Sequence, residues 1–323
     1  AVERTITTVS AAMADRELAW MFANCFPNTL DTTVTLREED GKPYTYVITG
    51  DIHAMWLRDS TAQVWPYLPL AKDDAALRRL LAGVVNQQTV CVLRDPYANA
   101  FYADPKKPGE FRGDHTTMKP GVHERKWEID SLCYVVRLAH GYWKATGDAA
   151  PFDARWAEAM RLIVKTFREQ QRLNGPGPYR HQRTARNPTD TQFGSGLGNP
   201  TRKVGLIHSM YRPSDDATYF PFLIPSNYFA MTELRLLADM ADAVLKDAAL
   251  AQDARALADQ LDAALNAGHP HFVKFIHVGR VNSQELKPFE QRVAGILCFL
   301  KHPFIKGKGR NFPNLGYVFH GAP

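Results

Sequence analysis

The sequence of 323 residues predicts an all-α protein. The predicted fold is a helical scaffold that has one face built from loops, together with a small β-hairpin. Three observations lead to this prediction. Apolar residues recur at three- and four-residue steps over much of the chain. The segments between these stretches are long and rich in Gly, Pro, Asn and aromatic residues. The sequence has no βαβ alternation, dinucleotide-binding glycine pattern or P-loop.

The first elements are expected close to the N-terminus. Residues 8–26 show helical periodicity with charged residues between the apolar positions, which predicts one helix. Residues 33–49 predict a hairpin, because the β-rich runs TVTL and YTYVIT flank the turn pair Asp40–Gly41.

Longer helices are expected further along the chain. The predicted helices span residues 73–91, 128–146, 151–171, 226–245 and 247–267. Gly147 and Gly268 are expected to end two of them, because glycine readily adopts the left-handed conformation that closes a helix. Ser226 and Asn227 are expected as N-terminal caps.

Two long joins separate these helices, over residues 92–127 and 172–225. Loops longer than about 15 residues are uncommon in compact domains unless they have a function. These joins hold most of the unusual polar and aromatic residues, so we expect them to form the functional face.

Composition excludes several classes of protein. The apolar fraction of 45% is that of a globular chain, and no stretch approaches the roughly 20 apolar residues of a membrane span. The net charge of +5 arises at one end, because residues 271–323 carry eight Lys and Arg against two Glu. The basic charge is therefore not spread over the fold as in a nucleic-acid-binding protein, and we expect neither a nucleic acid nor a membrane as partner.

The four cysteines lack CxxC or zinc-like spacing and are expected to be small buried apolar residues, with no metal or cofactor. They are Cys25, Cys91, Cys133 and Cys298. The chain starts at Ala1 without an initiator Met or a hydrophobic leader. It therefore reads either as a cytoplasmic protein or as the mature chain of a periplasmic or secreted one.

The stretch GDIHAMWLRDS, residues 50–60, combines an indole, a guanidinium and a carboxylate in Trp56, Arg58 and Asp59. A buried ion pair packed under an aromatic ring is one explanation. The other is one wall of a sugar pocket, since a sugar offers a C–H face to an indole and vicinal hydroxyls to charged groups. His53 fits a packed residue as well as a ligand contact.

Three further clusters could carry chemistry, although caps and salt bridges would also explain them. Asp95 and Asn99 follow a predicted helix, Glu128 and Asp130 stand where the next helix begins, and Arg212, Asp215 and Asp216 lie on a Pro-containing loop. The side chains of adjacent residues point apart, so Asp215 and Asp216 cannot form one catalytic dyad. We expect one of them to be chemical and the other to orient or bind.

The stretches GDIHAMWLRDS, DPYANAF, ERKWEIDSLCY, WKATGD and RPSDDATYFPFLIPSNYFA resemble glycoside hydrolase family 125, the exo-α-1,6-mannosidases. The resemblance covers residues 5–270. It implies an (α/α)6 barrel, a metal-independent reaction, and release of terminal α-1,6-linked mannose from a mannose-containing oligosaccharide or N-glycan with inversion. Inverting glycosidases need a general acid and a general base.

The resemblance also suggests residue roles. It places the general acid in the segment RPSDDA, at Asp215 or Asp216. The expected contacts to the terminal mannose are Trp56, Arg58 and Asp59, with His53, Asp95, Asn99, Glu128, Asp130 and Arg212 as further candidates for the pocket.

The chain departs from the family near its end. Residues 1–270 are expected to form the (α/α) barrel domain, and residues 271–323 a divergent basic tail that leaves the barrel incomplete. The resemblance implies that the family's general base is a Glu in the last part of a longer chain. It has no recognisable match here, and its loss would impair catalysis. His208 stands where the family pattern has Trp. Two alternatives follow, a non-catalytic carbohydrate-binding relic and a sugar isomerase or epimerase on an (α/α) barrel.

Overall fold

The computed structural model describes residues 1–185 and 187–268. Three predictions lie outside these residues: the tail 271–323, Cys298, and the incompleteness of the barrel at its C-terminal end. Residues Ala1–Leu265 form one unit.

The prediction of buried cysteines is confirmed for Cys91 and Cys133. Cys25 is exposed, so the prediction was wrong for that residue.

The N-terminal segment forms three helices, α1 Val2–Ala12, α2 Arg16–Cys25 and α3 Asn28–Thr32. The single helix predicted over residues 8–26 is therefore wrong. The chain leaves the helical conformation at Met13, and the Asp15 side chain accepts hydrogen bonds from the backbone N–H groups of Glu17 and Leu18. This cap starts a new helix where apolar periodicity alone showed a continuous one.

The predicted hairpin is confirmed as β1 Val34–Glu39 and β2 Lys42–Val47, which pair antiparallel. Asp40 and Gly41 form the turn with φ of 51° and 74°, as a two-residue hairpin loop of this type requires. The hairpin packs on the long helix α5 Ala75–Arg94, where Thr45 Oγ1 donates to the carbonyl of Leu80 at 2.7 Å.

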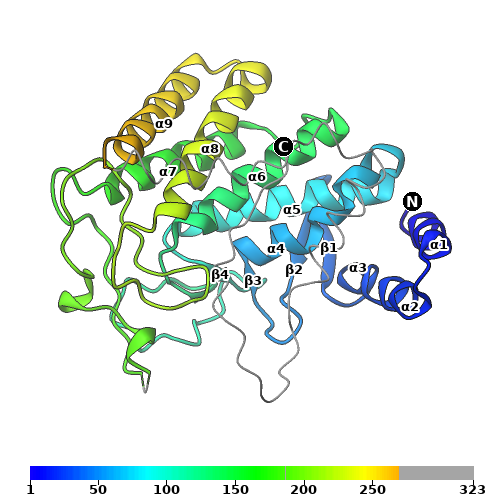
Figure 1. The fold of residues 1–323 in the computed structure, drawn as a ribbon, viewed down its shortest axis with the longest axis horizontal. Helices are drawn as coiled ribbons and strands as arrows, with labels where there is room; N and C mark the ends of the chain where they lie inside the picture. Colours follow the sequence, from blue (N-terminus) through cyan, green and yellow to red (C-terminus); the bar gives the residue numbers. More distant parts are fainter. Residues whose placement is uncertain (186, 269–323) are drawn as a thin grey trace. The chain divides into compact units, whose positions relative to one another are not determined.

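Most of the remaining helices form three consecutive pairs (Figure 1). The first pair is α4 Leu57–Val64, extended by the 3₁₀ segment η1 Trp65–Asp73, with α5; the second is α6 Ile129–Thr146 with α7 Ala154–Gln170; the third is α8 Ile224–Met240 with α9 Ala248–Gly268. The prediction of an all-α chain is confirmed.

Alternate helices run parallel. Thr61 of α4 donates to the carbonyl of Tyr134 in α6 at 3.0 Å, and three residues earlier Arg58 of α4 meets Asp130 of α6. Tyr134 in turn packs edge-on against Phe229 of α8, with ring centroids 5.0 Å apart. About one turn further along both helices, Arg137 of α6 lies 3.9 Å from Glu233 of α8. The N-terminal ends of α4, α6 and α8 therefore lie at the same end of this unit, as in an (α/α) barrel.

One predicted helix end is confirmed, and one predicted helix start is wrong. α6 ends at Gly147, whose φ of 70° is the left-handed conformation predicted for it. α8 begins at Ile224, before the predicted start, so Ser226 and Asn227 are not caps. Asn227 is buried in the first turn, and its side chain exchanges hydrogen bonds with the backbone of Ile207.

A small sheet of very short strands was not predicted. It pairs β3 Met55–Trp56 with β4 Ala100–Phe101, and β4 with β5 Val122–Glu124. The sheet joins the stretch of residues 50–60 to two distant parts of the loop between α5 and α6. It therefore fixes Arg58, at the start of α4, relative to the residues that precede α6.

Candidate active site

The guanidinium of Arg58 lies at the centre of a cluster of acidic side chains. Its Nη1 donates to Glu128 Oε2 at 2.8 Å and lies 3.4 Å from Asp130 Oδ2. Its Nε is 3.5 Å from Asp59 Oδ2, and its Nη2 is 4.0 Å from Asp215 Oδ1. The structure therefore brings together five of the predicted site residues from three separate segments.

The fold explains why these side chains converge. Arg58 and Asp59 belong to the first turn of α4, and Asp130 to the first turn of α6. Glu128 occupies the N-cap position of α6, but its side chain makes no capping bond and turns to Arg58 and to Ser131 Oγ, 2.9 Å away. The partial positive charge of a helix N-terminus favours anionic groups. Because α4 and α6 both begin at the same end of the unit, their N-terminal turns favour acidic side chains at one place.

Burial changes the proton affinity of these groups. It raises the pKa of Glu128 well above its ordinary value, against the opposing charge of Arg58. Burial also raises the pKa of Asp130 and the pKa of Asp215, again against Arg58. A carboxyl group that keeps its proton at higher pH than usual can act as a general acid.

Several carboxylate oxygens of the cluster are buried and accept no hydrogen bond from the described part of the chain. They are Asp59 Oδ2, Glu128 Oε1, Asp130 Oδ1 and Asp215 Oδ1. Folded proteins leave few buried acceptors unsatisfied, and functional sites are where such exceptions occur. The cluster therefore offers acceptors for a ligand with several hydroxyl groups.

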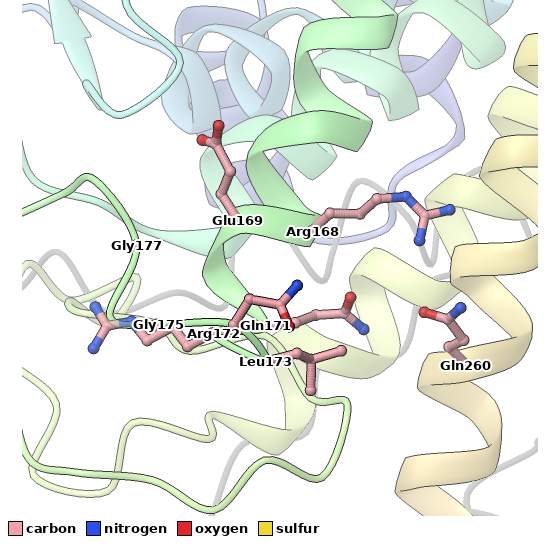
Figure 2. A pocket seen from close by; sticks show the side chains of 9 residues that line it. Arg168, Glu169, Gln171, Arg172, Leu173, Gly175, Gly177 and Gln260 are labelled. Atoms are coloured by element: carbon pink, nitrogen blue, oxygen red, sulfur yellow. The ribbon is translucent and has the colours of Figure 1, made fainter.

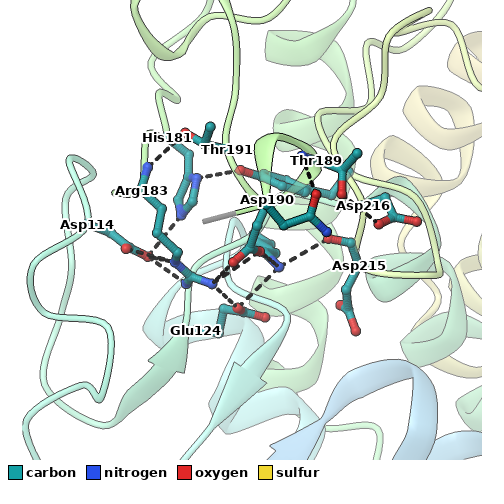
Figure 3. A network of polar contacts seen from close by, with 12 residues as sticks. Asp114, Glu124, His181, Arg183, Thr189, Asp190, Thr191, Asp215 and Asp216 are labelled. Carbon is teal, nitrogen blue, oxygen red and sulfur yellow. Dashed lines mark hydrogen bonds and ion pairs between the residues drawn. The ribbon is translucent and has the colours of Figure 1, made fainter. Parts of the chain in front are cut away.

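Asp215 and Asp216 differ in what they face, and Figure 3 shows their carboxyl groups pointing in different directions. Asp215 lies toward Arg58. Asp216 accepts from Arg212 Nη2 at 2.7 Å and from Thr189 Oγ1 at 3.2 Å. Asp216 and Arg212 thus tie the loop to its neighbours, whereas Asp215 belongs to the cluster.

Trp56 and His53 lie differently from the acidic residues. Trp56 is 8% exposed and packs edge-on against His123, with ring centroids 5.2 Å apart. Its buried neighbours include Ala54, Ala100 and Tyr102. His53 is exposed on the loop before β3, and the described contacts of the acidic cluster do not include it.

Asp95 and Asn99 are fully buried and shape the loop after α5. Asp95 Oδ2 accepts from Arg125 Nε at 2.7 Å. Asn99 donates to Glu124 Oε2 at 3.0 Å and accepts from the backbone N–H of Lys126 at 3.1 Å. The structure gives both residues protein partners, and neither has a described contact with Arg58.

A second polar network beside Asp215 was missed at the sequence level (Figure 3). Arg183 donates to both oxygens of Asp114 and to Glu124 Oε1, and Lys126 Nζ donates to Asp190 Oδ1 at 2.7 Å. These partners lie 59 to 69 positions apart. Such separations leave no spacing to recognise in the sequence, and the run of charged residues Glu124, Arg125 and Lys126 was the available signal.

A cavity of about 520 Å³ lies elsewhere, between the end of α7 and α9 (Figure 2). Its lining includes Arg168, Glu169, Arg172 and Gln260. Burial lowers the pKa of Arg172 to about 10, and its Nη1 donates to the carbonyl of Leu197 at 2.8 Å. None of the predicted site residues lines this cavity, so the Arg58 cluster remains the candidate for chemistry.

Within residues 1–185 and 187–268, no three His, Cys, Asp or Glu side chains are grouped so that they could hold a metal ion. In this part of the chain, no helix is both long and apolar enough to cross a membrane.

The chain matches the family described as metal-independent alpha-mannosidase (GH125) over residues 15–287. A curated relative, the meiotically up-regulated gene 157 protein of Schizosaccharomyces pombe, is 36% identical over 344 residues. The match covers 100% of this chain and 65% of the relative, so the chain spans just under two thirds of the relative's length.

A solved structure from Streptococcus pneumoniae is similar in fold and sequence. It is described as one of a new family of metal-independent alpha mannosidases, in a non-productive complex with α-1,6-mannobiose. The TM-score is 0.78 at 38% identity, and the match covers 82% of this chain and 62% of that chain.

Proposed function

The chain belongs to the GH125 family of metal-independent α-mannosidases, and from this premise we propose that it is an exo-acting glycoside hydrolase. The proposed substrate is a terminal α-1,6-linked mannose of an oligosaccharide or N-glycan, released with inversion of configuration. The related bacterial structure was solved with α-1,6-mannobiose, which supports the choice of linkage.

The observation that carries this proposal is the set of unsatisfied carboxylate oxygens around one guanidinium. A hexose presents vicinal hydroxyl groups, each of which can donate one hydrogen bond. Asp59, Glu128 and Asp130 would accept from these hydroxyls, while Arg58 would donate to a sugar oxygen. Trp56, two residues before Arg58 and 8% exposed, would contribute the exposed part of its ring.

Asp215 is proposed as the general acid. Its carboxyl group faces the cluster, and burial keeps its pKa above the ordinary value, so it can hold a proton for the glycosidic oxygen. Asp216, bound to Arg212, would orient the loop. Inversion also needs a base that activates water on the other face of the sugar, with the two carboxyl groups about 6.5–9.5 Å apart.

The test is a direct assay of the full chain. Incubation with α-1,6-mannobiose is expected to release mannose, and α-1,2- and α-1,3-mannobiose are expected to react more slowly. NMR during the first turnovers should show β-mannose, the product of inversion. Binding of mannose by calorimetry without any product would instead support a carbohydrate-binding relic. An epimerised or keto product would support an isomerase or epimerase.

A further inference from the structure

The backbone of Asp215 has a conformation that needs support. Its φ of 63° lies in the left-handed region, which Asp adopts more readily than most residues with a side chain, although at some cost. The Asp215 N–H donates to the carbonyl of Arg212 at 2.8 Å, and the Arg212 N–H donates to that of Asp216 at 2.9 Å. Such strain persists only where the surroundings fix it.

Lys126 supplies a contact of this kind. Its Nζ donates to the backbone oxygen of Asp215 at 3.1 Å and to Asp190 Oδ1 at 2.7 Å, and it lies 3.4 Å from Glu124 Oε1. The Lys126 side chain is only 5% exposed. The ammonium group thus makes two hydrogen bonds and one ion pair, which together limit the directions in which it can point.

The acceptors of Lys126 are themselves held in place (Figure 3). Arg183 Nη1 donates to Glu124 Oε1 at 2.9 Å, and Asn99 donates to the other oxygen of Glu124 at 3.0 Å. Arg183 also pairs with Asp114. Lys126 therefore connects the turn of Asp215 to a rigid frame that includes strand β5.

We propose that Lys126 is a positioning residue, which holds the Asp215 turn so that the carboxyl group faces Arg58. This inference rests on the proposed function, in which Asp215 is the general acid. Lys126 has no described contact with the unsatisfied oxygens of the cluster and acts through the backbone of Asp215.

The charge of Lys126 also acts on Asp215. Burial lowers the pKa of Lys126, but Glu124 and Asp190 outweigh this, so the residue stays an ammonium ion. The charged groups that act on Asp215 are Arg58 from α4, Asp130 at α6, and Glu124 and Lys126 from β5 and the residues after it. Glu128 acts on Asp215 through a side-chain hydrogen bond that lowers its pKa. Burial raises the pKa of Asp215, and Lys126 is one of the groups that oppose this. Without Lys126, the pKa of Asp215 should rise further.

The experiment compares Lys126→Met and Lys126→Arg with a control, Lys165→Met. Lys165 is exposed and pairs with Glu169 within α7, far along the chain from the turn. Hydrogen exchange is measured at the backbone N–H of Arg212 and Asp215. The Asp215 carboxyl group is titrated by carbon NMR, assigned with Asp215→Asn. Neither measurement requires turnover.

In Lys126→Met, exchange at Arg212 and Asp215 is expected to accelerate about tenfold, the effect of losing one buried hydrogen-bond partner. The Asp215 titration should move to higher pH, while exchange in α6 and α8 stays unchanged. Lys126→Arg keeps the charge and should show a smaller acceleration with a titration close to wild type. Lys165→Met should change neither.

If Lys126→Met leaves exchange and titration at their wild-type values, the inference is overturned. Should that variant not fold, an unchanged exchange rate in Lys126→Arg would overturn it equally. In an active enzyme, Lys126→Met should lower kcat more than it changes KM and shift the alkaline limb of kcat/KM to higher pH. A wild-type chain that releases no mannose would refute the proposed function, while the NMR measurements would still decide the role of Lys126.

Discussion

At the scale of single residues, the protonation of the acidic cluster depends on one positive charge, that of Arg58, which interacts with several carboxyl groups at once. Burial lowers the pKa of Arg58, but the surrounding carboxylates outweigh this and keep it charged. The side chains of Glu128 and Asp130 are 0% and 3% exposed, whereas that of Asp215 is 45% exposed. In the proposed function, Asp215 is therefore the carboxyl group that can exchange its proton with solvent and substrate. The two buried carboxyl groups are proposed as fixed binding groups.

Replacing the proposed acid gives the first prediction. Asp215→Asn should lower kcat on α-1,6-mannobiose by roughly 10²–10⁴-fold, the usual contribution of a general acid. The loss should be much smaller on an aryl mannoside with a good leaving group, because that bond breaks with little protonation. Steady-state kinetics on both substrates measures the difference.

Asp216→Asn is the matched variant for that measurement. Because Asp216 binds Arg212 and Thr189 instead of facing the cluster, its loss should be smaller and similar for both substrates. A larger loss in Asp216→Asn, confined to the substrate with the poor leaving group, would assign the acid to Asp216.

At the scale of elements, the contact between α6 and α8 contains a buried acid. Glu233 of α8 is 2% exposed, its Oε1 lies 3.9 Å from Arg137 Nη1 of α6, and its Oε2 has no hydrogen-bond partner in the described structure. Burial raises the pKa of Glu233 from 4.5 to about 8, although Arg137 opposes this. The two helices therefore pack around a carboxyl group that is protonated at neutral pH.

This contact predicts a pH dependence of stability. Between pH 4.5 and about 8, folded Glu233 holds a proton that the unfolded chain has lost, so the free energy of unfolding falls as pH rises through this window. The fall is about 1.4 kcal/mol for each unit by which the two pKa values differ. Glu233→Gln should remove it and be more stable than wild type at pH 9, with little difference at pH 4. Urea unfolding at both values measures this, and a wild-type advantage at pH 9 would contradict it.

The packing of the hairpin on α5 gives another prediction at this scale. A Cβ at Gly83 would lie 2.2 Å from Thr45 Oγ1 and 2.9 Å from the backbone nitrogen of Thr45. Gly83→Ala should therefore lower the free energy of unfolding by about 1–3 kcal/mol, as overpacking does. Gly113→Ala is the control, because a Cβ at Gly113 would have no heavy atom within 4 Å among the described residues. Equal unfolding midpoints for the two variants would show that β2 can move away from α5.

At the scale of the whole molecule, the sequence predicted the elements that carry their own end signals. The hairpin turn at Asp40–Gly41 and the end of α6 at Gly147 depend on local backbone chemistry, and both were found as expected. Helix α4 was not predicted, because it has only eight residues and leads into a 3₁₀ segment that contains Pro69. Strands of two or three residues show no alternation, so the sheet β3–β4–β5 was also missed.

The candidate site could be predicted only where residue type was informative by itself. An Arg close to a Trp, and an Asp pair on a loop, are combinations that indicate a functional site from the sequence. The structure places Arg58 Nη2 4.0 Å from Asp215 Oδ1. Asp95 and Asn99 looked similar, but their partners Arg125 and Glu124 come from a distant part of the same loop. Which polar residues pair with each other and which remain unsatisfied depends on tertiary contacts.

Ligand binding links the site to the stability of the whole fold. A sugar that binds only the folded state stabilises it by about 2.7 kcal/mol at a hundred times its Kd. Mannose at that concentration should therefore raise the Tm by roughly 4 °C, as measured by calorimetry. Arg58→Lys keeps one positive charge but loses the planar donor fork, and its Tm should rise much less with mannose.

Arg79→Met is the control, because Arg79 is an exposed partner of Glu38 and has no described contact with the acidic cluster. Its Tm should rise with mannose as much as that of wild type. Lowering the pH tests the same linkage through the carboxyl groups. Because protonated carboxyl groups accept fewer hydrogen bonds from a sugar, the rise in Tm caused by mannose should become smaller at low pH. If Arg58→Lys kept the full rise at every pH, the sugar would bind somewhere other than the Arg58 cluster, and the cavity beside α7 and α9 would be the next place to examine.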